Sequence, residues 1–161
     1  MRVIADVSRH SEGVAVPNFD PVNPNYVKAL ERMIYSMPIA QFFGLRFTRI
    51  EPGSVEMEMP FRKELSFTEG AFQAGPIGTL LDFTAGSAGG TLLPPDWGTS
   101  TIDFTVKVLA PARGDKFIGR GAVVSWGKSI SVGEAKVFAI AGSQETLCAT
   151  GLVTMRNFSL G

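Results

Sequence analysis

The segment PIGTLLDFTAGSAGGTLL, residues 76–93, restricts the possible folds of this chain more than any other feature. It is too long and too rich in small residues for a β-strand, and two prolines follow it at once, so we predict a helix over residues 76–93. Each glycine inside a helix costs about 1 kcal/mol relative to alanine. Four glycines interrupt this one: Gly78, Gly86, Gly89 and Gly90. Such a helix must be held by its surroundings, and its small residues let a sheet, a second helix or a ligand come close.

The residues before this helix show two different spacings of apolar side chains. Residues 26–43 place apolar side chains three and four positions apart, which predicts an amphipathic helix. Asn25 is a suitable N-cap for it, and Pro38 is expected to end or kink it. The residues that follow alternate between apolar and polar, which predicts two short strands joined by a turn at Pro52-Gly53.

In the C-terminal half, apolar and polar residues alternate over long stretches, which predicts four strands. They occupy residues 101–111, 116–127, 129–142 and 144–156. The joints between them are short, which favours an antiparallel meander. Three glycines in these strands suggest bulges or bends that curl the sheet around a helix: Gly119, Gly121 and Gly133. With residues 62–75 as a loop, the order of elements predicts an α+β fold whose long helix packs on one sheet face.

Length, composition and charge limit the organisation and the partners. We expect an irregular arm over residues 1–25 and one domain over residues 26–161, with its helix at 26–43 and its core at 44–157. Fifteen basic residues balance fifteen acidic ones, so net charge predicts neither nucleic-acid binding nor membrane binding. The sequence lacks both a long apolar span and a secretion signal, and we expect a cytoplasmic protein.

Few residues are available for nucleophilic or metal chemistry. The chain has one histidine, His10, near its start, and one cysteine, Cys148, inside a predicted strand. We expect Cys148 to serve in packing, and we expect no metal site and no cofactor. Glycine patterns for dinucleotides or phosphates are absent at strand-to-helix joints, which argues against NAD or ATP.

The predicted long helix carries a single charge, Asp82, among apolar neighbours that include Leu80 and Phe83. It stands about two turns from the helix start, too deep for an N-cap. A buried carboxylate must be paired, hydrogen-bonded, protonated or used in chemistry. The residues themselves leave two interpretations open: an aspartate held by a hydroxyl such as Thr79 or Thr84, and a functional carboxylate.

The stretch FQAGPIGTLLDF, which contains this aspartate, resembles the signature of hotdog-fold thioesterases of the phenylacetate-degradation (PaaI-like) branch. In that family a His-Gly-Gly turn opens the central helix, and an acidic residue follows nine positions after the histidine. Here Gln73, Ala74 and Gly75 occupy the turn, and Asp82 stands nine positions after Gln73.

A second stretch, TIDFTVKVLAPARGD, is similar to the family's strand with a hydroxyl residue at its start and a Pro-x-x-Gly turn after it. The resemblance covers about residues 42–155. It implies a hotdog fold, in which a curved antiparallel sheet wraps a long central helix, here with an extra N-terminal helix. It also implies a homodimer or a dimer of dimers whose acyl-CoA sites lie at the dimer interface.

The implied activity is hydrolysis of an acyl-CoA or aryl-acyl-CoA thioester to free acid and CoA. Asp82 matches the catalytic carboxylate, which acts as general base or as nucleophile. Ala74, with Gly75 beside it, matches the position whose backbone N–H polarises the thioester carbonyl at the helix N-terminus. Thr101 matches a hydroxyl residue that positions water or the carboxylate. Gln73 replaces the usual histidine and keeps the capacity to donate and accept hydrogen bonds.

Four further residues are candidates for substrate binding. Phe67 stands where relatives carry an asparagine or glutamine, with the polar Thr68 next to it. Arg113 and Lys128 lie in predicted turns, where cations can meet the phosphates of CoA. Because phenylalanine does not hydrogen-bond, a second function stays open beside the hydrolase, an acyl-CoA-binding hotdog protein that is non-catalytic or nearly inactive.

Overall fold

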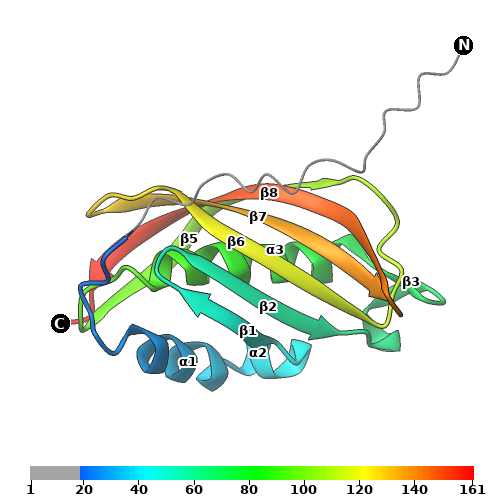
Figure 1. Cartoon of the computed structure of the whole chain (residues 1–161), viewed down its shortest axis with the longest axis horizontal. Coiled ribbons are helices and arrows are strands. Elements are labelled where there is room, and N and C mark those ends of the chain that lie inside the picture. Colours follow the sequence, from blue (N-terminus) through cyan, green and yellow to red (C-terminus); the bar gives the residue numbers. More distant parts are fainter. Residues whose placement is uncertain (1–18) are drawn as a thin grey trace, which may run out of the picture.

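A computed structural model describes residues 19–161, and in it one long helix, α3 (Ala74–Gly90), lies against a six-stranded antiparallel sheet (Figure 1). The strands are β1 (Arg46–Glu51), β2 (Ser54–Pro60), β5 (Trp97–Val108), β6 (Lys116–Ser125), β7 (Ile130–Ala141) and β8 (Gln144–Ser159). Their order across the sheet is β1-β2-β6-β7-β8-β5. The predicted α+β architecture, a sheet around one long helix, is confirmed.

The N-terminal residues form two helices instead of the single one predicted over 26–43. They are α1 (Tyr26–Ser36) and α2 (Pro38–Phe43), and Met37 between them has an extended backbone. Pro38 is the first residue of α2, where the missing N–H costs nothing, so it ends one helix and begins the next. Asn25 holds the N-cap position of α1, but its side chain makes no capping hydrogen bond. Most of the predicted arm, including His10, lies outside the described residues.

The region predicted as a loop over residues 62–75 contains short regular elements. A 3₁₀ turn (Lys63–Leu65) leads into a small hairpin of β3 (Ser66–Thr68) and β4 (Ala71–Phe72). Gly70 turns this hairpin with a φ of 70°, a left-handed conformation that favours glycine. The hairpin ends at the first residues of α3, which begins two residues earlier than predicted and ends at Gly90.

The predicted four-strand meander is wrong at one joint. β6, β7 and β8 do follow one another, but β5 pairs with β8 and not with β6, so it lies at the far edge of the sheet. The residues between β5 and β6 do not form a tight turn; they pair with the β3–β4 hairpin. Phe72 donates its N–H to Ala112, and Ala71 forms a bridge with Arg113. Sequence alternation indicates a strand but does not say which neighbour it takes.

Three glycines of the sheet allow it to lie unusually close to α3. A Cβ placed on Gly119 would overlap the hydroxyl of Thr84, and one on Gly121 would lie 2.7 Å from the Thr84 carbonyl oxygen. At Gly133 it would lie 2.9 Å from the carbonyl oxygen of Ala85. The sequence prediction assigned these glycines to bends; the structure shows that they make room for the helix.

The core fills the space between α3 and the concave side of the sheet. Its largest fully buried apolar side chains come from β2, α3, β6, β7 and β8: Val55, Met57, Met59, Ile77, Leu80, Leu81, Phe117, Val137, Val153 and Met155. α1 adds Leu30 and Ile34 from outside α3. None of the helices in residues 19–161 is long and apolar enough to cross a membrane.

Gly121→Ala tests the close approach of helix and sheet. We expect it to lower the free energy of unfolding by about 1–3 kcal/mol, because the new methyl group meets helix backbone that cannot rotate away. Chemical denaturation measures the change. Gly78→Ala is the matched control. Its Cβ would lie 3.5 Å from the side chains of Phe104 and Val106, an ordinary contact, and alanine is worth up to about 1 kcal/mol in a helix interior. Equal stability of the two variants would contradict this account.

Candidate active site

Asp82 is half-buried on α3 and is held by one hydroxyl group. The Oγ1 of Thr101, on β5, donates a hydrogen bond to Asp82 Oδ1 at 2.7 Å. Burial raises the pKa of the Asp82 carboxyl above its ordinary value, and the hydrogen bond from Thr101 opposes part of that shift. The hydroxyls of Thr79 and Thr84 bond instead to backbone carbonyls of their own helix. The structure therefore joins Asp82 to Thr101, and not to either helix threonine.

Asp82 faces a cavity of about 150 Å³ between α3, β5 and α1. From α3 and β5 the lining residues are Asp82, Phe83, Gly86, Ser87, Thr99 and Thr101, and from α1 and its end they are Met33, Ile34 and Met37. The carboxylate thus opens into a space whose other walls are mostly apolar. A carboxylate in such a place has few groups to stabilise its charge and is well suited to take a proton.

The start of α3 presents backbone N–H groups at an exposed position. Gln73 is the N-cap, and its side-chain carbonyl accepts a hydrogen bond from the N–H of Gly75. Among residues 19–161, the N–H of Ala74 has no hydrogen-bond acceptor. The helix dipole adds to its positive character, so Ala74 N–H is the donor available to a developing oxyanion. Gly75 N–H becomes available only when the Gln73 side chain turns away.

A separate, larger cavity of about 650 Å³ lies at this end of α3. Gln73 and Ala74 line it together with Phe67, which is 67% exposed. Its other walls are the residues Phe72, Ile77, Val108, Leu109, Ala110, Pro111, Ala112 and Cys148. This end of the helix therefore offers an apolar surface next to the Ala74 N–H, and Phe67 contributes to it through its ring.

The two halves of the predicted site are far apart within one protomer. Asp82 stands eight positions after Ala74, which is about 12 Å along a helix. A carboxylate and an oxyanion donor that serve one carbonyl must each come within about 3 Å of the reacting atoms. The Asp82 cavity and the Ala74 cavity share no lining residue. One copy of the chain therefore does not assemble both groups around one thioester.

The predicted phosphate contacts lie at opposite ends of the sheet. Arg113 is exposed at the end where α3 begins, and its guanidinium donates to the carbonyl of Glu69 at 3.0 Å. Thr68 lies at the same end and lines another cavity beside the β3–β4 hairpin. Lys128 is exposed in the turn between β6 and β7, a strand length of about 30 Å from that end.

Other candidate groups do not add chemistry. Cys148 is buried, its thiol donates to the Val137 carbonyl at 3.2 Å, and burial raises its pKa to about 11, so it stays protonated. Across residues 19–161, no three side chains of the metal-ligating types come together.

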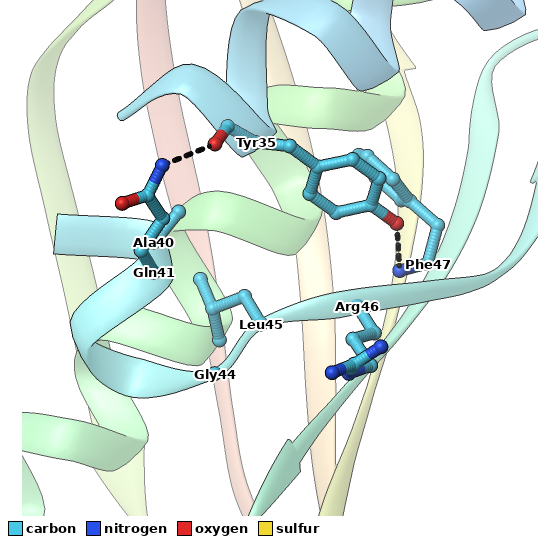
Figure 2. Close-up of a pocket in the computed structure, with 7 residues that line it drawn as sticks. All are labelled: Tyr35, Ala40, Gln41, Gly44, Leu45, Arg46 and Phe47. Carbon is cyan, nitrogen blue, oxygen red and sulfur yellow. Dashed lines mark hydrogen bonds between the residues drawn. The ribbon is translucent and has the colours of Figure 1, made fainter. Parts of the chain in front are cut away.

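A cavity of about 480 Å³ lies beside β1 and is drawn in Figure 2. Among the described residues, neither a carboxylate nor a thiol lines it. There the Tyr35 hydroxyl accepts from Phe47 N–H at 3.0 Å and thereby covers an edge of β1.

Sequence reasoning missed the contribution of α1 to the Asp82 cavity. The apolar spacing over residues 26–43 predicted one apolar face, and Met33 and Met37, which belong to that spacing, both line this cavity. Nothing in the period indicated that this face would meet the side of α3 that carries Asp82. Only the packing of the two helices supplies that information.

The raised pKa of Asp82 predicts a pH-dependent cost to stability. In the unfolded chain an aspartate has a pKa of about 3.9. Above both pKa values the buried charge destabilises the fold, and below the unfolded value the penalty is gone. We expect Asp82→Asn to be more stable than the wild type at neutral pH, with a gap that narrows as the pH falls toward about 4.

Thr101→Val serves as the control in a double-mutant cycle. Loss of the hydroxyl should destabilise the protein when Asp82 is charged and should cost much less in the Asp82→Asn background. Denaturant titrations at several pH values measure all four proteins. A wild type that is more stable than Asp82→Asn at neutral pH would show that the pKa is shifted the other way.

Comparisons with known proteins assign the chain to a family. A candidate esterase of Halobacterium salinarum is 30% identical over 128 residues, which span 74% of this chain and 84% of that protein. A thioesterase family protein of Silicibacter pomeroyi has a similar structure, with a TM-score of 0.81 and 29% identity over 83% of this chain and 98% of that one.

A phenylacetic acid degradation-related protein of Ralstonia eutropha has the same fold, with a TM-score of 0.68 and 20% identity over 79% of this chain and 98% of that one. No family model matches the chain. The relative, the structural neighbours and the sheet wrapped around α3 agree with one another. The chain therefore belongs to the hotdog-fold thioesterase superfamily, a family of thioester hydrolases.

Proposed function

We propose that this protein is a PaaI-like acyl-CoA thioesterase, with each active site formed between two copies of the chain. The observation that carries the proposal is the half-buried carboxylate of Asp82, which faces a mostly apolar cavity and is oriented by Thr101. The substrate is an acyl-CoA or aryl-acyl-CoA thioester. The products are the free acid and CoA.

In this mechanism Asp82 acts as general base. The carboxylate takes a proton from a water molecule while the water oxygen attacks the thioester carbonyl carbon. The carbonyl oxygen becomes an oxyanion, which the N–H of Ala74 stabilises. The C–S bond then breaks, and the CoA sulfur leaves with the proton from Asp82. Direct attack by the carboxylate, through an anhydride that water hydrolyses, uses the same groups.

The separation of about 12 Å between Ala74 and Asp82 along α3 is the reason for placing the site between two copies. β5 is an edge strand of 12 residues, and apolar side chains along it stay exposed, although Phe104 reaches α3 at Gly78. Phe104 is 46% exposed, and Ile102 and Val108 are more so. A long apolar edge of this kind is normally covered by another strand. A second copy of β5 provides that strand.

Contacts along β5 support one position for the two-fold axis. Thr101 marks the level of Asp82, and Val108 lines the same cavity as Ala74. An irregularity between Thr101 and Asp103 adds one residue to the strand, so Thr105 lies midway between Thr101 and Val108 in register. In an antiparallel pair with its two-fold axis at Thr105, Thr101 of one copy faces Val108 of the other. This register brings Asp82 of each copy to the start of α3 in the other.

The same register suggests how CoA is bound. It brings the sheet end that carries Lys128 in one copy toward the end that carries Arg113 in the other, so both cations lie at one end of the dimer. Phe67 and the apolar wall around Ala74 then border the thioester, and Gln73 lies next to the oxyanion position. A dimer of dimers would leave these contacts unchanged.

An acyl-CoA-binding protein without turnover is the second candidate. Two observations favour it. Phe67 supplies no hydrogen bond at the Ala74 cavity, and the N–H of Gly75 already donates its hydrogen bond to the side chain of Gln73. Hydrolysis measurements separate the two functions. A protein that binds acyl-CoA tightly but releases no thiol from short, medium, long or aromatic thioesters is the binder.

Loss of either catalytic group should abolish most of the activity. We expect Asp82→Asn to lower kcat by about 10²–10⁴-fold, the usual contribution of a general base. Ala74→Pro removes only the N–H, because proline suits the first residue of a helix and Gln73 before it is already extended. We expect that variant to lose about 10²–10³-fold in kcat. Free-thiol release from acyl-CoA measures both, and thermal unfolding checks that they fold.

Mixing these two inactive variants tests whether the groups come from different copies. In a mixed dimer one site has both defects and the other has neither. Random exchange of subunits should therefore restore about a quarter of the wild-type activity, because half of the dimers are mixed and each has one intact site. If each copy supplied both of its own groups, every site in the mixture would carry a defect and activity would not return.

Phe104→Asp should separate the copies. In the proposed register residue 104 of each copy faces Val106 of the other, so the variant sets two carboxylates against apolar partners beside the axis. We expect a monomer in sedimentation and the loss of hydrolysis with it. Val124→Asp is the control, because Val124 is 56% exposed on β6, away from the β5 edge. A Phe104→Asp protein that remains dimeric and active would rule out this interface.

A further inference from the structure

α1 lies along the side of α3 that carries Asp82. Its apolar residues Leu30, Met33 and Ile34, and Met37 directly after the helix, are spaced by three and four positions and face α3. On α3, Asp82, Gly86 and Gly90 follow one another at intervals of four, so they form one line along the helix. The two faces enclose a groove that starts at the Asp82 carboxylate and runs toward the end of α3.

The groove is open at Gly86 and closed at Gly90. A Cβ added to Gly86 would have the Met155 sulfur as its nearest neighbour, at 3.9 Å, so the missing side chain leaves room. At Gly90 the Cδ1 of Leu30 lies 3.0 Å from the position a Cβ would take, so Leu30 fills the groove. Met33 and Met37 both line the cavity at Asp82 and Gly86, and Met33 also lines a small cavity at Gly90. Both methionines are partly exposed.

The dimensions of this groove suit a small apolar group. From Asp82 to Gly86 the helix advances about 6 Å, and to Gly90 about 12 Å. Single bonds of about 1.5 Å advance an extended chain by about 1.3 Å per carbon, so about five carbons reach Gly86. The cavity volume is about 150 Å³. An apolar cavity of that size in another protein binds benzene.

We propose that α1 closes the acyl end of the active site, and that Met33 and Met37 limit the substrate to short acyl chains or to a single ring. About five carbons reach Gly86, and at most about nine reach the end of the groove at Gly90. This inference rests on the proposed function and specifies its substrate class. Methionine is unbranched and adaptable, so these side chains fit around groups of slightly different shape while Leu30 fixes the end. The acyl group lies on Gly86, and the thioester carbonyl lies at Asp82.

The test is a kcat/KM series over straight-chain acyl-CoAs from two to twelve carbons and phenylacetyl-CoA. We expect the wild type to prefer the short and aromatic members. In the double variant Met33→Ala, Met37→Ala the optimum should move to longer chains, with a gain of about fourfold for each further methylene that the enlarged groove buries. Met37→Phe should act in the opposite direction and favour the shortest chains.

Ile39→Ala is the matched control, because Ile39 is 48% exposed on α2 and does not line the cavity. It should leave the chain-length preference unchanged. A wild-type optimum at ten or more carbons overturns the proposal. So does a preference that the methionine variants do not move. Should the double variant fail to fold, Met37→Phe decides alone.

A binding series separates this proposal from the proposed function. S-alkyl-CoA thioethers of increasing length, which no thioesterase can cleave, are titrated by calorimetry into the wild type and the same variants. If no thioester is hydrolysed but thioether binding shows the expected length dependence and shift, the groove is supported and the thioesterase is not. If thioesters are hydrolysed with no dependence on Met33 or Met37, the thioesterase stands and the groove is wrong.

Discussion

The close contact between α3 and the sheet is the constraint on which the rest of this protein depends. Gly121 and Gly133 let the strands approach the helix backbone around Thr84 and Ala85, at distances that any side chain would prevent. A helix with four glycines is weak by itself, and this contact holds it in place. The same packing sets the rotation of α3 about its axis, so that Asp82 points toward β5 and α1 instead of into the core.

The proposed chemistry depends on the position of Asp82. The core takes the neighbouring Leu80 and Leu81, while Asp82 remains half-buried and accepts its hydrogen bond from Thr101 on another element. Burial keeps its pKa raised, which supports the proposed role of Asp82 as the group that accepts a proton during hydrolysis. The N–H of Ala74 is at the other end of the first two helical turns. This distance, together with the exposed apolar edge of β5, supports the proposal that two copies share each site.

The two edge strands of the sheet differ in whether another part of the chain covers them. At β1 the Tyr35 hydroxyl accepts from Phe47 N–H, so a side chain of α1 covers that edge. At β5 no element of residues 19–161 covers the strand, and its apolar side chains are exposed. α1 thus contributes twice, since it protects one edge with Tyr35 and closes the Asp82 cavity with Met33 and Met37. The uncovered edge is the one next to the proposed active site.

Local sequence determined the elements of this fold. The small residues of 76–93, the alternation after position 100 and Pro38 predicted the long helix, the strands and the break before α2, and the spacing from Gln73 to Asp82 indicated the family. Only the tertiary structure decided that β5 pairs with β8, that Thr101 and not Thr79 or Thr84 holds Asp82, and that Met33 and Met37 face it. The physical reason is that periodicity records which side of an element is buried, whereas strand partners and the residues around a site depend on contacts between segments distant in the chain.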